Sequence, residues 1–272
     1  MELAGKVVVV TGGASGIGRA LALRFAEEGA AAVVVADLDA AGAEAVAGAI
    51  GPRAAGLRCD VADEAQVAVL VDHAERAFGP VDLFCANAGV AVGTDPASPD
   101  AEWDLASAVN VRSHVLAARR LLPGWLERGS GHFLSTASAA GLLTQIGSAP
   151  YAVTKHAAVA FAEWLAVTYG DRGIGVSCLC PMGVDTPLLH AGEEAGGVAA
   201  TASAVVQAAG RVLAPEEVAD VVVEGLREGR FLILPHPEVL EFFRRKAEDY
   251  DRWLAGMRRL QAQTEGALGG AR

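Results

Sequence analysis

Tyr151 and Lys155 lie four residues apart in a stretch that we expect to be helical. Side chains at positions i and i+4 share one face of an α-helix, so the phenol and the ammonium would be neighbours. A tyrosine has an ordinary pKa of about 10, and a nearby ammonium stabilises the phenolate, so we expect the pKa of Tyr151 to be lowered. The phenol could then exchange a proton with a hydroxyl group nearer neutral pH. Ser138, at the end of an expected strand, could hold the reacting oxygen.

A tyrosine and a lysine at this spacing are common by chance and usually mark a solvated helix face. A second motif argues against chance, because a glycine-rich turn joins the first expected strand to the next helix. In such a turn the backbone can approach a pyrophosphate, and the helix start supplies N–H groups and the positive end of its dipole. The spacing here is GxxxGxG rather than the commoner GxGxxG. The expected contacts in the turn are Gly12, Ser15, Gly16, Ile17 and Gly18.

Asp37 stands at the end of the second expected strand, nineteen residues after Gly18. A carboxylate there can accept hydrogen bonds from both ribose hydroxyls of an adenosine and would repel a 2′-phosphate. The neighbouring Leu38 is apolar and no basic residue replaces it, so this site favours NAD over NADP. The alternative is a helix N-cap, a role that Asp37 or Asp39 could fill.

Asp60 and Val61 follow the third expected strand. The Asp60 carboxylate could contact the adenine edge, with Val61 beside it. Alternatively, Asp60 could cap the helix that begins near Glu64.

Short apolar runs rich in β-branched residues alternate with longer amphipathic stretches. Expected strands cover residues 6–10, 32–36, 56–59, 83–86, 132–136, 175–179 and 231–234. Expected helices cover residues 17–29, 40–50, 64–78, 101–127, 150–169 and 215–228. Continuous apolar strands suit burial on both faces, and their alternation with helices indicates a parallel sheet. The sequence therefore predicts an α/β fold, a single-domain Rossmann-type doubly wound parallel sheet of about seven strands with helices on both faces.

Two further segments have their own expected roles. Residues 1–235 form the expected dinucleotide-binding and catalytic domain, in which the Ala- and Gly-rich residues 185–210 lie above the carboxyl edge of the sheet. We expect a substrate lid there, with an ordinary surface connection as the alternative. Residues 236–272 form an expected C-terminal helical extension and tail. Their apolar positions at helical spacing indicate a helix over 238–261 that packs on its own protein or across a subunit boundary and closes the substrate site.

Composition excludes several classes of partner. The formal net charge is −11, which argues against nucleic acid because phosphate binding needs clustered Lys and Arg. The four cysteines form no CxxC pair and no Cys/His cluster with metal-ligand spacing, so no metal is expected. Cys178 and Cys180 would share one face of a strand as buried thiols. Without a leader or an apolar run of membrane-spanning length, we expect a cytoplasmic protein with no membrane partner.

Taken in order, these motifs resemble the short-chain dehydrogenase/reductase family, in its shorter branch, over about Leu3 to Leu234. The resemblance adds two groups of cofactor contacts: Asn87, Ala88 and Gly89 on the adenine side, and Pro181, Gly183, Val184 and Thr186 beside the nicotinamide. The family usually has Pro-Gly in the second group, whereas this chain has Pro181-Met182-Gly183.

The resemblance implies hydride transfer between NAD and a secondary alcohol or ketone, with Ser138, Tyr151, Lys155 and Asn110 as catalytic residues. Tyr151 would exchange the hydroxyl proton, and Lys155 would lower its pKa and hold the nicotinamide ribose. Asn110 would help to hold a water in a proton relay to the lysine. The alternatives are an NADPH-dependent ketoacyl-type reductase and a non-catalytic dinucleotide sensor on the same fold.

Candidate substrate contacts are Ser138, Ala140, Gln145, Tyr151, Met182 and Leu188. Most are apolar and none carries a fixed positive charge, which favours a medium-sized, largely apolar alcohol or ketone over a carboxylate or phosphate. Gln145 either recognises a second polar group of the substrate or is a surface residue.

The expected helices 101–127 and 150–169 are apolar on more than one face, which is typical of buried helices. The family commonly forms dimers and tetramers through these helices, so we expect a homo-oligomer, either a dimer or a homotetramer. Alternatively, the Ala-rich composition inflates their apparent apolarity.

Overall fold

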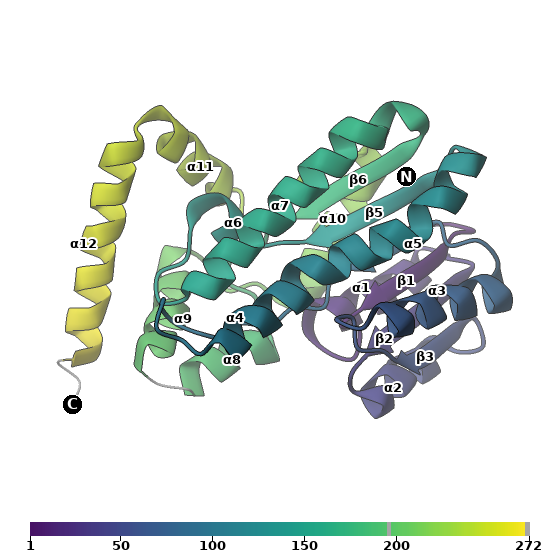
Figure 1. Ribbon diagram of the computed structural model, residues 1–272, viewed down its shortest axis with the longest axis horizontal. Helices are drawn as coiled ribbons and strands as arrows, with labels where there is room; N and C mark the ends of the chain where they lie inside the picture. The colour runs from purple at the N-terminus through teal and green to yellow at the C-terminus, as the bar shows by residue number, and fades with distance from the viewer. Residues whose placement is uncertain (195–196, 270–272) are drawn as a thin grey trace.

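Seven parallel strands form one sheet in the computed structural model, which describes residues 1–194 and 197–269 (Figure 1). They are β1 (Val7–Thr11), β2 (Ala32–Asp37), β3 (Ala54–Arg58), β4 (Leu83–Ala86), β5 (Gly131–Thr136), β6 (Ile174–Leu179) and β7 (Leu232–Ile233). Their order is β3-β2-β1-β4-β5-β6-β7. The chain builds outward from β1 to β3, returns to the other side of β1 with β4, and then continues to β7. An open α/β sheet leaves a ligand crevice at its carboxyl edge where this reversal occurs.

Helices cover both faces of the sheet (Figure 1). The main ones are α1 (Gly16–Glu27), α2 (Ala40–Ile50), α3 (Glu64–Phe78), α5 (Ser113–Arg128), α7 (Ala149–Tyr169) and α10 (Pro215–Glu228). Along β1, Val7 and Val9 join the core under α3, α5 and α7, whereas Val8 and Val10 join the core under α1, α2 and α10. Because both faces are covered, the strand needs no polar face, and its sequence is a continuous apolar run. The predicted doubly wound fold is confirmed.

The expected helix 101–127 is divided in the structure. It comprises α4 (Asp100–Ser107), a π-helical turn η1 (Ala108–Arg112) and α5. A π-turn accommodates an extra residue, which changes the direction of the side chains on either side of it. Asn110 lies in this turn and is fully buried.

The segment expected as a lid contains two helices, α8 (Pro187–Glu194) and α9 (Gly197–Ala209). Residues 195–196, between them, lie outside the described residues. Alanine has the highest helix propensity, which accounts for helix formation in this Ala-rich stretch. A short helix, α6 (Ala140–Leu143), faces the same region.

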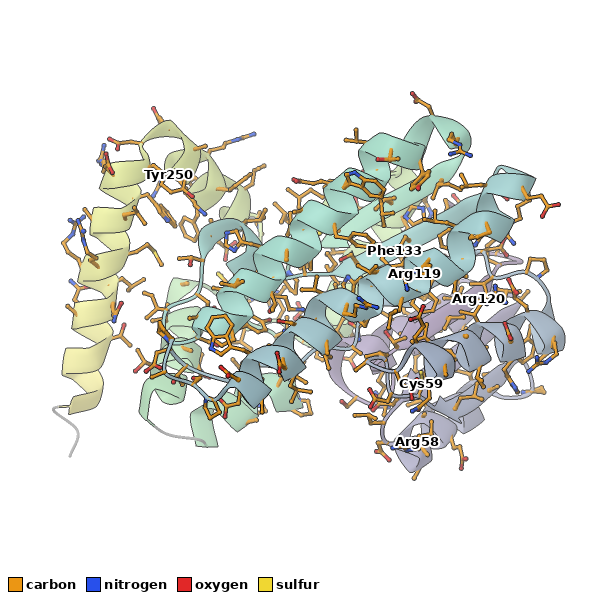
Figure 2. The ribbon with its side chains drawn as sticks, viewed as in Figure 1. Arg58, Cys59, Arg119, Arg120, Phe133 and Tyr250 are labelled. Atoms are coloured by element: carbon orange, nitrogen blue, oxygen red, sulfur yellow. The ribbon has the colours of Figure 1, made fainter. Side chains whose placement is uncertain are left out.

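The C-terminal extension forms two helices rather than one, α11 (Glu238–Glu248) and α12 (Tyr250–Gly269). Asp249 has extended backbone dihedral angles between them, so the chain turns there. Figure 1 shows α12, in yellow, beside the body of the protein, where it packs against α9. Figure 2 shows Tyr250 at the junction of α11 and α12. Among the described helices, none is both long and apolar enough to cross a membrane.

Candidate active site

The turn between β1 and α1 brings backbone into contact with backbone. Gly12 has φ +63°, in the left-handed region that favours glycine, and a Cβ there would lie 2.8 Å from the Cα of Ala88. A Cβ on Gly18 would lie 2.0 Å from the carbonyl oxygen of Gly12, so α1 can pack on the turn only with glycine here. Within the described chain, the Ser15 side chain makes no capping hydrogen bond to α1. The positive end of α1 therefore lacks a side-chain cap and suits a phosphate group.

Asp37 ends β2 with both carboxylate oxygens accepting backbone N–H groups. Oδ2 accepts the N–H of Ala14 at 3.0 Å, and Oδ1 accepts that of Asp39 at 3.1 Å. The Asp39 side chain caps α2 by accepting the N–H of Gly42 at 3.0 Å. Of the two candidates for this cap, Asp39 is therefore the cap, and the Asp37 carboxylate is held beside the glycine turn.

A similar arrangement follows β3. Asp63 caps α3 by accepting two N–H groups of its first turn. Asp60 lines the cavity with Val61, and its Oδ1 accepts the N–H of Ala62 at 2.9 Å. The alternative that Asp60 caps α3 is therefore wrong.

Asn87 fixes the end of β4 to the end of β1. Its Nδ2 donates to the carbonyl oxygens of Thr11 at 3.0 Å and Gly12 at 3.3 Å. In return, Thr11 Oγ1 accepts the N–H groups of Asn87 at 3.0 Å and Ala88 at 3.2 Å. Asn87 therefore sets the floor of the crevice and the shape of the glycine turn.

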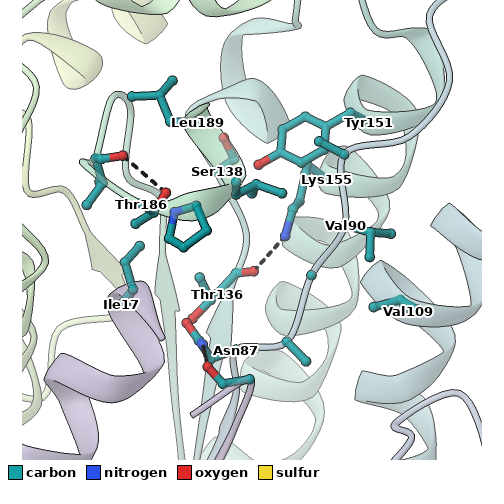
Figure 3. A pocket seen from close by; sticks show the side chains of 18 of the residues that line it. Ile17, Asn87, Val90, Val109, Thr136, Ser138, Tyr151, Lys155, Thr186 and Leu189 are labelled. Carbon is teal, nitrogen blue, oxygen red and sulfur yellow. Dashed lines mark hydrogen bonds between the residues drawn. The ribbon is translucent and has the colours of Figure 1, made fainter. Parts of the chain in front are cut away.

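Ser138, Tyr151 and Lys155 meet beyond this floor, as Figure 3 shows. The Ser138 hydroxyl lies beside Tyr151, donates to the Pro181 carbonyl oxygen at 3.4 Å and accepts the N–H of Ala140 at 3.1 Å. Lys155 Nζ donates to the carbonyl oxygen of Thr136 at 3.0 Å and lies 5.6 Å from the centroid of the Tyr151 ring. Tyr151 and Lys155 come from the first two turns of α7, and Ser138 from the loop after β5, so only the folded chain brings the three together.

Burial changes the acidity of both titratable groups. The pKa of Lys155 falls from 10.5 to about 8, because the buried ammonium has lost its hydration. Burial also raises the pKa of Tyr151 above its ordinary value, and the neighbouring Ser138 hydroxyl opposes part of that rise. The prediction of a lowered Tyr151 pKa is therefore wrong as a net direction, because the buried phenolate loses its hydration. The phenol stays protonated at neutral pH.

Asn110 lies behind the site rather than in the cavity wall. Its Nδ2 donates to the Val90 carbonyl oxygen at 2.9 Å and to Thr154 Oγ1 at 3.1 Å, and its Oδ1 accepts the Val90 N–H at 2.9 Å. It thereby ties the loop after β4 to α7 next to Lys155. A Cβ on Gly89 would lie 3.3 Å from Asn110 Oδ1 and 3.4 Å from Lys155 Nζ, so the glycine keeps the space between them open.

One cavity of about 580 Å³ joins the glycine turn to the Ser–Tyr–Lys set. Every predicted cofactor contact except Gly183 lines it: Gly12, Ser15, Gly16, Ile17, Gly18, Asp37, Leu38, Asp60, Val61, Asn87, Ala88, Gly89, Tyr151, Lys155, Pro181, Val184 and Thr186. So do the predicted substrate contacts Ser138, Gln145, Tyr151, Met182 and Leu188. Ala140 does not line this cavity but lines a second one, which it shares with Ser138.

Gly183 has a structural role instead. Its carbonyl oxygen accepts the N–H of Leu213 at 2.9 Å and lies 3.1 Å from Nε2 of His236. His236 is buried, and its Nδ1 accepts the N–H of Met182 at 3.1 Å. The residue that interrupts the usual Pro-Gly pair is thus held by a histidine from the C-terminal extension. Sequence reasoning missed His236, because no local pattern connects residues that lie 54 positions apart.

The cavity fits a dinucleotide in three respects. The glycine turn leaves space that no side chain could share, and the Asp37 carboxylate lines the same cavity. The Thr136 hydroxyl is also buried in the cavity wall with no hydrogen-bond partner among the described residues, so a polar group remains for a ligand. These are the features that an adenosine ribose, a pyrophosphate and a nicotinamide ribose require.

Comparisons with known proteins agree with this geometry. A family model described as short chain dehydrogenase matches residues 6–195. Cis-4-hydroxycyclohexanecarboxylate dehydrogenase of Sinomonas cyclohexanicum is 40% identical over 225 residues, which cover 80% of this chain and 87% of that protein. The sex determination protein tasselseed-2 of Zea mays is 39% identical over 195 residues, covering 69% of this chain and 58% of that protein. This chain also superimposes on the solved structure of a short chain dehydrogenase/reductase from Burkholderia phymatum in complex with NAD, with a TM-score of 0.84. The two sequences are 34% identical, and the match covers 92% of this chain and 96% of that one.

Proposed function

Because the chain belongs to the short-chain dehydrogenase/reductase family of oxidoreductases, we propose that it transfers a hydride between NAD and the carbon of a secondary alcohol or ketone. The observation that carries the proposal is the meeting of Ser138, Tyr151 and Lys155 in a cavity that also contains the glycine turn and Asp37. Such an arrangement supports proton donation to a substrate held next to a bound dinucleotide.

When bound, the nicotinamide supplies or accepts the hydride at the substrate carbon. In the reduction direction, the Tyr151 hydroxyl donates its proton to the carbonyl oxygen, which the Ser138 hydroxyl holds in place. The Lys155 ammonium then stabilises the phenolate that remains, because it is mostly protonated below its pKa of about 8. In the oxidation direction, Tyr151 must first lose its own proton and then accepts the proton of the substrate hydroxyl.

Asn110 acts in this scheme as a positioning residue. Its amide joins Val90 to Thr154, the residue that precedes Lys155 on α7. The relay water that the family resemblance places near Asn110 remains a prediction.

The preference for NAD rests on Asp37. Its carboxylate is fixed by two backbone N–H groups at the end of β2, where a 2′-phosphate would meet its negative charge. The relative from Burkholderia phymatum was solved with NAD bound, which supports the same choice.

The proposed substrate is a largely apolar secondary alcohol or ketone. Around the Ser–Tyr–Lys set the cavity wall is mostly aliphatic, with Val90, Val109, Leu188, Leu189 and Val206. The name of the relative from Sinomonas cyclohexanicum gives its substrate as a cyclohexanecarboxylate with a ring hydroxyl, and that ring hydroxyl supports an alicyclic alcohol for this chain.

We further propose that α7 takes part in a homo-oligomer, a dimer or a tetramer. Val153, Trp164 and Val167 on this helix are 57%, 54% and 87% exposed in one chain, and exposed apolar side chains of this kind mark a surface that contacts another protein.

The four cysteines are free and buried, which supports a reducing compartment such as the cytoplasm. Residues 1–235 would form the catalytic domain and residues 236–272 its helical extension.

The direct test measures NADH and NADPH formation with a panel of secondary alcohols, comparing wild type with Tyr151→Phe. We expect NADH formation that falls at least about 1,000-fold in the variant, because the proton-exchanging group is lost. NAD binding, measured by calorimetry, should be unchanged in Tyr151→Phe. NAD binding without turnover on any alcohol would support a dinucleotide sensor instead, and unchanged turnover in the variant would contradict the role of Tyr151.

A further inference from the structure

A second cavity adjoins the first at Ser138. Its volume is about 1130 Å³, and α6, α9, α11 and α12 form its walls. Four residues line both this cavity and the first one: Ser138, Gln145, Met182 and Val206. The hydroxyl that would hold the reacting oxygen therefore stands between two adjoining spaces.

The outer wall of this cavity is anchored by contacts of the C-terminal extension. Lys246 is buried, its Nζ donates to the Leu142 carbonyl oxygen at 2.7 Å, and it lies 5.3 Å from the centroid of the Tyr250 ring. On the inner face, the Phe242 and Trp253 rings pack with centroids 6.5 Å apart. On the opposite side, Gln145 Nε2 donates to the Ala202 carbonyl oxygen of α9 at 3.3 Å.

The chemistry of the wall changes with exposure to solvent. The buried and half-buried lining includes apolar side chains from three helices: Leu143 on α6, Val205 on α9, and Met257 and Leu260 on α12. Exposed charged residues of both signs lie at the outer edge: Arg245, Glu248, Asp249, Arg252 and Arg259. Arg245 pairs with Glu241, and Asp249 accepts the backbone N–H of Arg252 at 2.9 Å. An apolar space that ends at a hydrated, mixed-charge rim suits a long apolar body and favours neither sign at its far end.

We propose that the second cavity is part of the substrate site and that it binds the apolar body of an elongated secondary alcohol or ketone. The reacting carbon lies at Ser138 and Tyr151, and the body extends between α9 and α12 towards the charged rim. The extension then determines specificity by the length of substrate that it accommodates. This inference rests on the proposed function, and it adds the size and polarity of the substrate.

A glycine on α12 allows a sharp test. Gly256 lines the second cavity, and a Cβ there would meet only Arg259 Nη2, at 3.8 Å. Gly256→Phe should therefore place a ring in the cavity without a backbone clash. Gly266→Phe is the matched control, because Gly266 is exposed on the same helix and a Cβ there has nothing within 4 Å. Both substitutions replace a helix glycine, so effects on helix stability should be alike.

The first measurement is kcat/KM for 2-alkanols from 2-butanol to 2-dodecanol. One buried methylene contributes about 0.8 kcal/mol, which corresponds to about fourfold, so kcat/KM should rise by up to about fourfold per methylene in wild type and Gly266→Phe. In Gly256→Phe the rise should stop early, leaving 2-dodecanol at least about tenfold below wild type and 2-butanol within twofold. A flat length series in wild type, or an equal loss for short and long alcohols in Gly256→Phe, would overturn the inference.

The second measurement is independent of turnover and uses binding of 2-dodecanone by calorimetry. Binding that weakens about tenfold in Gly256→Phe but not in Gly266→Phe supports the inference. If such binding is seen but no alcohol is oxidised, only the proposed function is refuted. Turnover of short alcohols without 2-dodecanone binding would refute only the second cavity. A third outcome, no 2-dodecanone binding together with a lower sedimentation coefficient for Gly256→Phe, would assign the cavity to a second copy of the chain and likewise overturn the inference.

Discussion

Replacing Lys155 by methionine should stabilise the protein at neutral pH while abolishing turnover. Lys155 is 3% exposed, and burial lowers its pKa from 10.5 to about 8. At about 1.36 kcal/mol per pKa unit, holding the ammonium in the folded protein costs about 3 kcal/mol. Methionine has a similar length and no charge, but it loses the hydrogen bond to Thr136, worth about 1 kcal/mol. We therefore expect Lys155→Met to raise the free energy of unfolding at pH 7 by about 2 kcal/mol.

The gain in stability of Lys155→Met over wild type should shrink as the pH rises. Below pH 8, the lysine is charged in both the folded and the unfolded chain, so the full cost of burial is present. Between pH 8 and 10.5 the unfolded chain binds more protons than the folded one, so wild type gains stability as the pH rises. Near pH 10 the remaining cost is about 1 kcal/mol, which the lost hydrogen bond offsets, and the two proteins should be equally stable.

Urea denaturation at pH 7 and pH 10, followed by circular dichroism, measures this difference. Lys6→Met is the control, because Lys6 is 40% exposed and its ion pair with Asp82 spans 3.8 Å. A surface pair of that kind should change stability by no more than about 0.5 kcal/mol at either pH. A Lys155→Met variant that is no more stable than wild type at pH 7, or whose advantage persists unchanged at pH 10, would refute the reasoning.

Two further predictions concern the cofactor. Asp37→Ala should weaken NAD binding about tenfold and strengthen NADP binding, because the substitution removes both the hydrogen-bond acceptor for the ribose and the negative charge. Calorimetry with both dinucleotides measures the two affinities. A wild type that already prefers NADP would contradict the prediction. Gly18→Ala should abolish NAD binding, because its Cβ would lie 2.0 Å from the Gly12 carbonyl oxygen, whereas Gly48→Ala on α2 has nothing within 4 Å and should bind NAD normally. Equal affinities in these two variants would show that the close packing at Gly18 is not required.

Local patterns were sufficient for most of the elements. The predicted helices 40–50, 64–78 and 215–228 have the same bounds as α2, α3 and α10, and the predicted strand 83–86 has those of β4. Apolar spacing and capping residues act within a few positions of one another, so they can be read from one stretch of chain. The π-turn around Asn110 could not be predicted in this way, because its side chain finds its partners Val90 and Thr154 on other elements.

The sequence by itself determined the doubly wound fold and which residues are candidates for the site. The glycine turn, Asp37 and the Ser138, Tyr151 and Lys155 set could be identified because their chemistry depends on residue type and short spacing. Only the tertiary structure decided the acidity of Tyr151, since loss of hydration depends on everything that surrounds the ring. The same holds for His236, which contacts Met182 54 positions away, and for the second cavity, whose lining runs from Ser138 to α12. Contacts of that kind arise from how the elements pack, and no local pattern encodes them.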